Sequence, residues 1–201
     1  MNLANKLTIF RIILVPTMVI IPFLNLDNLC VNTIIPLTWI IIEAIFIIAS
    51  ITDKLDGHIA RSRNEITTFG KFLDPIADKI LVLAAMIMLV QYQRLPAWIP
   101  IIVLFREFIV SGYRLVAVGE NGNVIAASIW GKIKTVTQMF ALILALVDMN
   151  AYGKFMSGEL KGFPLILNVS AFVLMTISVI ATVFSGWDYL KNGKDILFKS
   201  K

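Results

Sequence analysis

The chain has 201 residues, of which 58% are hydrophobic, and a mean hydropathy of +0.85. Soluble domains are typically about 45–50% apolar, so this composition excludes an ordinary soluble domain, and the single cysteine excludes an intramolecular disulfide. Basic loops against anionic lipid explain the net charge of +5, so no nucleic acid partner is needed. Apolar runs recur along the whole chain without a polar linker, which predicts one transmembrane domain over residues 1–201.

Six segments are each long enough to cross a bilayer, which takes about 20 mostly apolar residues. The first covers residues 7–26; it resembles a signal peptide but lacks an A-x-A-like cleavage site, so we expect an uncleaved helix. The other five are expected at 33–52, 69–92, 96–118, 131–149 and 163–185. The predicted fold is all-α: a polytopic membrane protein with six transmembrane helices.

Basic residues predict the orientation of these helices. All but three of the 18 Lys and Arg residues lie at the N-terminus, within 53–79, within 106–134 or in the tail after Asp188. By the positive-inside rule these regions and both termini are cytoplasmic, and the expected location is the plasma membrane. The charged residues that intrude into the middle helices, apart from Glu43, then lie on the cytoplasmic side. They can line one polar cavity that faces the cytoplasm.

Aspartates gather where the second helix leads into the third. Asp53 and Asp56 are three residues apart and Asp74 and Asp78 are four apart, so each pair shares one face of a helix. Such carboxylates, brought together near lipid, would repel one another strongly without cations between them. Hard oxygen ligands predict Mg²⁺ or Mn²⁺, and two ions suit displacement at phosphorus. The alternative is a solvated loop in which these aspartates form salt bridges with neighbouring basic residues.

The stretch from Asp53 to Asp78 reads D-x-x-D-G-x-x-A-R, then eight residues, then G-x-x-x-D-x-x-x-D. At every defining position it resembles the signature of the CDP-alcohol phosphotransferase family. The resemblance implies transfer of a phosphatidyl group from CDP-diacylglycerol to an alcohol, with CMP as the leaving group. It also implies a six-helix protein that forms a homodimer.

The resemblance further implies roles for individual residues. Asp53, Asp56 and Asp74 would hold the metal ions, and Asp78 would help to bind them or act as the base that deprotonates the acceptor hydroxyl. The residues expected to bind the CDP group are Asp53, Gly57, Ala60, Arg61 and Gly70. In the N-terminal segment Asn5, Thr8 and Arg11 could touch the nucleotide or the diphosphate, although helix-start chemistry at the membrane interface explains them almost as well.

The remaining polar positions indicate which acceptor the protein uses. Five further segments together resemble the branch of the family that uses glycerol 3-phosphate. They are Asn5-Lys6-Leu7-Thr8-x-x-Arg11, Arg106-Glu107, Arg114, Gly131 to Thr135 and Asp188-Tyr189. Independently of that resemblance, clustered cations suit a phosphate dianion such as sn-glycerol 3-phosphate. The candidate phosphate-binding residues are Arg106, Arg114, Lys132 and Lys134. Alternatively, these cations reach lipid headgroups, and Glu107 forms a structural pair with Arg114.

The sequence leaves three alternatives to this function open. The acceptor could be phosphatidylglycerol, serine or an inositol phosphate, as in other branches of the family. Intramembrane prenyltransferases also use paired aspartate motifs with Mg²⁺, but without the D-G-x-x-A-R sequence. A small cation transporter could bind ions with intramembrane carboxylates, although it would need broken helices or repeats around the site.

Overall fold

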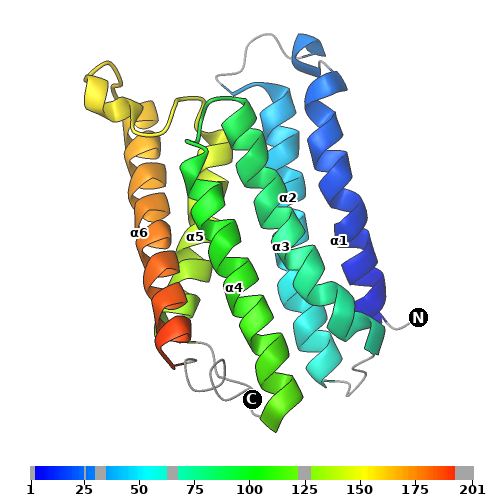
Figure 1. Ribbon diagram of the computed structural model, residues 1–201. Helices are drawn as coiled ribbons and strands as arrows, with labels where there is room; N and C mark the ends of the chain where they lie inside the picture. The colour runs from blue at the N-terminus through cyan, green and yellow to red at the C-terminus, as the bar shows by residue number, and fades with distance from the viewer. Residues whose placement is uncertain (1–2, 25, 30–34, 63–67, 122–127, 193–201) are drawn as a thin grey trace. The chain divides into compact units, whose positions relative to one another are not determined.

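The computed structural model describes residues 3–24, 26–29, 35–62, 68–121 and 128–192, and in parts of the helices it describes the backbone alone. Every regular element in these ranges is helical (Figure 1). The long helices are α1 (Leu3–Ile20), α2 (Leu37–Ser62), α3 (Thr68–Gln91), α4 (Trp98–Asn121), α5 (Ile129–Val147) and α6 (Phe163–Asn192). Short 3-10 helices are η1 (Ile21–Leu24), η2 (Leu26–Leu29) and η3 (Lys154–Ser157). The predicted all-α class is confirmed.

Each long helix overlaps one of the six predicted segments. Three segments, Asn5–Leu24, Ile129–Val147 and Phe163–Lys191, are long and apolar enough to cross a membrane by length and composition, as expected of a membrane protein. The number of crossings stays a prediction. Three helices, α2, α4 and α6, continue past their predicted ends. With 26 residues, α2 is about 39 Å long, against about 30 Å for the hydrocarbon layer of a bilayer.

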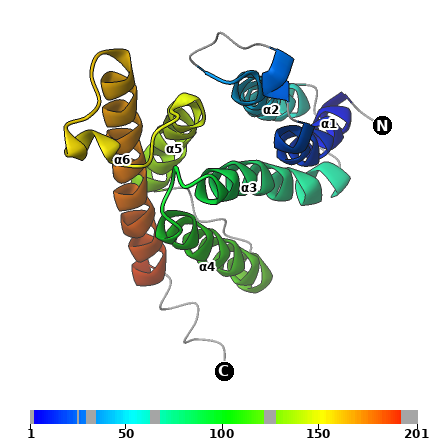
Figure 2. The same cartoon turned by 90° about the horizontal axis from the view of Figure 1, so that it is seen from above.

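The chain divides into two compact units, one formed by Met1–Arg94 with Ala145–Met149 and the other by Leu95–Leu144 with Asn150–Lys201. In the first unit α1 packs along both α2 and α3 (Figures 1 and 2). Large apolar side chains fill the interior of this unit, among them Met18, Phe46 and Leu81, all fully buried. The predicted organisation as a single domain stays a prediction.

Arg94, in the turn after α3, connects several parts of the first unit. Its Nη1 donates to the carbonyl oxygen of Leu146 at 3.4 Å, and its Nη2 lies 3.0 Å from the sulfur of Met149. The guanidinium Cζ is 3.7 Å from the centroid of the Trp39 ring. Burial lowers the pKa of Arg94 to about 10, with nearby Asp148 acting in the opposite direction, so the side chain stays charged at neutral pH. Arg94 therefore caps the C-terminal turn of α5 while it stacks on α2.

In the second unit α4 packs against α6. The N-terminus of α5 is capped by Ser128, whose Oγ accepts the backbone N–H of Gly131 at 3.2 Å. Near the other end of the unit, Asn168 on α6 holds the loop before that helix. Its amide nitrogen donates to the carbonyl oxygen of Ala151 at 3.1 Å, and its Oδ1 accepts the N–H of Phe155 at 3.0 Å. The start of α5 and the loop before α6 are therefore each held by a specific polar side chain.

Candidate active site

The buried face of α1 is polar at its N-terminal end. Asn5, Thr8 and Arg11 follow one another at intervals of three residues, and all three side chains are buried. Nη1 of Arg11 lies 2.7 Å from Oδ1 of Asp53 on α2, and Arg11 itself is completely enclosed. The N-terminal residues that were expected near the nucleotide are thus packed inside the first unit, with Arg11 in direct contact with the aspartate segment.

The four predicted metal ligands lie on the two helices expected for them. Asp53 and Asp56 are part of α2, and Asp74 and Asp78 are part of α3, so their spacing is that of neighbours on one helical face. The side chain of Asp53 is 36% exposed and Asp78 is exposed. The side chains of Asp56 and Asp74 lie outside the described residues. The same applies to Gly57, Ala60, Arg61 and Gly70, for which only helical backbone is described.

The donor chemistry of this segment fits a hard divalent cation. Among the side chains that the structure describes, no group of three acidic, His or Cys residues forms a metal site. Of the two described members, Asp53 is partly exposed and Asp78 is exposed, and carboxylate oxygen is the ligand that Mg²⁺ and Mn²⁺ prefer. The residues present therefore fit the predicted metal ions.

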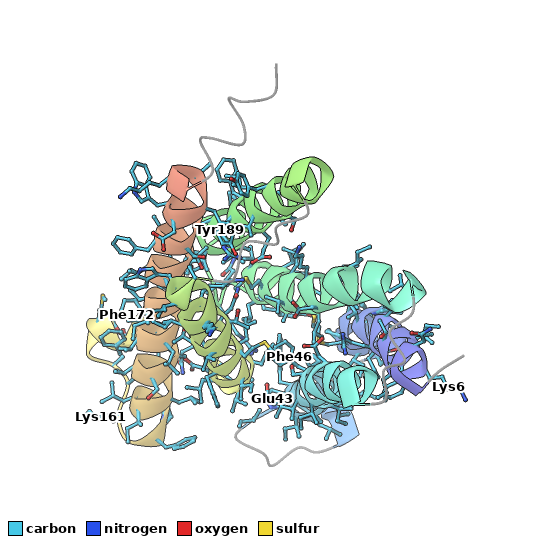
Figure 3. All side chains as sticks on the ribbon, turned by 90° about the horizontal axis from the view of Figure 1, so that it is seen from below. Lys6, Glu43, Phe46, Lys161, Phe172 and Tyr189 are labelled. Atoms are coloured by element: carbon cyan, nitrogen blue, oxygen red, sulfur yellow. The ribbon has the colours of Figure 1, made fainter. Side chains whose placement is uncertain are left out.

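A second charged cluster lies in the second unit, where α4, α5 and α6 meet. Oε1 of Glu107 accepts from Nζ of Lys134 at 2.6 Å and from Nη1 of Arg106 at 2.9 Å. Nη2 of Arg106 donates to Oγ of Ser185 at 2.5 Å. We call Arg106, Glu107, Lys134 and Ser185 the Glu107 cluster. Figure 3 shows Tyr189 between α4 and α6, and its ring centroid is 5.7 Å from Cζ of Arg106.

Two glycines leave room for the Arg106 side chain in this cluster. A Cβ atom at Gly131 would lie 3.4 Å from Nη2 of Arg106, and one at Gly186 would lie 3.5 Å from its Cγ. A Cβ atom at either position would therefore make an ordinary contact with Arg106, and glycine leaves that space to the Arg106 side chain. Of the other predicted acceptor-binding cations, Lys132 is exposed on α5, and the side chain of Arg114 lies outside the described residues. The structure thus brings Arg106 and Lys134 together and leaves Lys132 apart from them.

Two pairings were missed by reasoning from the sequence. The sequence suggested Arg114 as the partner of Glu107, because the two share a face of one helix, but the described contact of Glu107 on α5 is Lys134, 27 residues away. A contact between separate helices leaves no periodic signal in the sequence. The contact between Arg11 and Asp53 was missed for the same reason, although the regular spacing of polar residues on α1 was a signal that this face is packed.

Comparison with known proteins identifies the family. The sequence profile described as CDP-alcohol phosphatidyltransferase matches residues 1–185, and the chain belongs to this family. A relative from Bacillus subtilis named CDP-diacylglycerol--glycerol-3-phosphate 3-phosphatidyltransferase is 43% identical, with 98% of this chain and 97% of the relative covered. A relative of the same name from Haemophilus influenzae is 37% identical over 98% of this chain and 95% of its own length. A probable phosphatidylglycerophosphate synthase from Mycobacterium tuberculosis is 36% identical, over 94% of this chain and 80% of its own length.

Proposed function

We propose that this protein transfers the phosphatidyl group of CDP-diacylglycerol to sn-glycerol 3-phosphate, giving phosphatidylglycerophosphate and CMP. The observation that carries the proposal is the similarity, over nearly the whole chain, to relatives named for this reaction. The aspartate signature supports phosphatidyl transfer. The pair of cations in the Glu107 cluster supports a phosphorylated acceptor, because a phosphate dianion is bound best by clustered cations.

In the proposed reaction the acyl chains of the donor stay in lipid while its diphosphate meets the aspartate segment. Asp53, Asp56, Asp74 and Asp78 would hold two Mg²⁺ or Mn²⁺ ions, which when bound neutralise the diphosphate and increase its reactivity. Asp78 accepts the proton of the acceptor 1-hydroxyl. The hydroxyl oxygen then bonds to the β-phosphorus, and the bond from that phosphorus to CMP breaks. The residues proposed to bind the CDP group are Asn5, Thr8, Asp53, Gly57, Ala60, Arg61 and Gly70.

We further propose that both termini and the active site face the cytoplasm at the plasma membrane, and that the protein is a homodimer. The distribution of basic residues supports the orientation, because basic loops are retained on the cytoplasmic side. A cytoplasmic site also gives direct access to a charged, water-soluble acceptor. The family resemblance supports the dimer. Substrates and membrane lipid complete the proposed partners, and no nucleic acid is among them.

The deciding experiment measures CMP release from CDP-diacylglycerol by the purified protein in detergent with Mg²⁺. Four acceptors are compared: glycerol 3-phosphate, serine, inositol phosphate and phosphatidylglycerol. We expect release that depends on glycerol 3-phosphate. Release with another acceptor would retain phosphatidyl transfer but contradict the assigned acceptor. No release with any of them, together with ion uptake in liposomes, would favour a transporter.

A further inference from the structure

The Glu107 cluster places one carboxylate between the two cations that the proposed function assigns to the acceptor. A single oxygen, Oε1, accepts from Lys134 on α5 and from Arg106 on its own helix. The side chains of Lys134, Arg106 and Glu107 are 9%, 12% and 19% exposed. Ion pairs with this little exposure are screened far less by water and salt than surface pairs. The carboxylate of Glu107 therefore attracts both cations strongly.

The cluster is held by several hydrogen bonds but is incomplete as a hydrogen-bonding unit. Arg106 is fixed at Nη1 by Glu107 and at Nη2 by Ser185 on α6. Its Nε is buried and finds no acceptor within the described ranges of the chain. Two cations and one carboxylate leave the cluster with a net positive charge. A buried guanidinium N–H without an acceptor is unfavourable, and an oxygen of a phosphate group would satisfy both the donor and the charge.

We infer that Glu107 is a positioning residue for the phosphate of the acceptor. Its carboxylate holds the Lys134 ammonium and the Arg106 guanidinium close to each other, so that a phosphate monoester dianion that enters the cluster contacts both cations. Without this carboxylate the two enclosed cations repel each other, and the long side chains take other rotamers. This inference rests on the proposed function and adds to it a residue that acts through Lys134 and Arg106.

The test is a double-mutant cycle with Glu107→Gln and Lys134→Gln, assayed by CMP release. Glutamine preserves the shape of Glu107 and removes its charge. Each single change should raise KM for glycerol 3-phosphate roughly tenfold, the size expected for one hydrogen bond to a charged group, and leave KM for CDP-diacylglycerol unchanged. If Glu107 acts through Lys134 and Arg106, the rise in KM of the double variant should be clearly smaller than the product of the two single effects. Glu107→Asp, which keeps the charge, should show a smaller rise than Glu107→Gln.

The matched control is Glu159→Gln. Glu159 lies in the loop after η3 and forms an exposed pair with Lys154, and breaking this pair should leave both KM values unchanged. A binding readout accompanies the kinetics: glycerol 3-phosphate should raise Tm of the unaltered protein and of the control, but not of Glu107→Gln at the same concentration. An unchanged KM in Glu107→Gln, equal rises in KM for both substrates, or a double variant with the product of the single effects would overturn the inference. If Glu107→Gln does not fold, an unchanged KM in Glu107→Asp overturns it. No release dependent on glycerol 3-phosphate from the unaltered protein would instead overturn the proposed function.

Discussion

Among single residues, Arg11 joins the first helix to the aspartate segment. Its guanidinium is enclosed and lies 2.7 Å from the Asp53 carboxylate. We expect Arg11→Met to lower the free energy of unfolding by about 1–3 kcal/mol, because a partly buried carboxylate loses its cation. Arg11→Lys should lose less, since it keeps the charge but not the planar fork. Thermal unfolding in detergent measures both. Equal stability of the two variants and the unaltered protein would show that the contact contributes nothing.

Asp78 is the residue on which the proposed proton transfer depends. Its side chain is exposed, so Asp78→Asn should leave the fold intact. We expect turnover to fall by at least about 100-fold, the lower end of what a general base contributes. CMP release and the circular dichroism spectrum are measured on the same preparation. Turnover near that of the unaltered protein would rule out Asp78 as the base.

Individual roles could be predicted where the sequence carries a fixed spacing, and not where contacts join distant segments. The aspartates were placed on their helices correctly because Asp53 with Asp56 and Asp74 with Asp78 follow the helical repeat. Lys132 and Lys134 looked equivalent in the sequence, yet Lys134 is buried against Glu107 and Lys132 is exposed. Residues two positions apart point in directions about 200° apart around a helix of 3.6 residues per turn. Only the packing of neighbouring helices decides which of the two is enclosed.

At the scale of whole helices, apolar composition predicted where each helix lies but not where it ends. The predicted second segment ended at residue 52, whereas α2 continues to Ser62. Hydropathy marks where the apolar, lipid-facing sequence ends. A helix ends where its backbone hydrogen bonds stop and a cap begins, and these hydrogen bonds can continue through polar sequence. The cap itself can come from elsewhere in the chain: Oδ1 of Asp27 accepts the N–H of Thr38 at 3.0 Å, at the first turn of α2. No local rule pairs these two residues.

Arg94 provides a prediction at this scale, because it links the ends of helices. We expect Arg94→Lys to lower Tm by about 2–4 °C, equivalent to about 1 kcal/mol in a chain of this size, because lysine cannot both stack on Trp39 and donate to Leu146. Arg94→Met should lower it further. CMP release below the unfolding temperature should stay unchanged, since Arg94 has no part in the proposed chemistry. A loss of turnover without a change in Tm would contradict this structural role.

For the whole molecule, the aspartate segment predicts that metal contributes to folding as well as to turnover. In the proposed metal site, the carboxylates of α2 and α3 would repel one another when no cation is bound. Treatment with EDTA should therefore abolish CMP release and also lower Tm, and added Mg²⁺ or Mn²⁺ should restore both. Replacing Asp53 and Asp56 by Asn should reduce the effect of EDTA on Tm, because fewer like charges remain. An enzyme that is fully active after complete metal removal would contradict the proposed cofactor.

The length of α2 has a consequence for how such an enzyme meets its substrates. Its apolar stretch is followed by about two to three further turns that carry Asp53 and Asp56, which would place these two residues at the level of the headgroups. A lipid donor then finds the site by lateral diffusion in two dimensions, whereas the acceptor arrives from bulk water. In mixed micelles the rate should accordingly follow the mole fraction of CDP-diacylglycerol in the surface. Adding inert detergent at a constant total amount of donor should slow turnover by surface dilution.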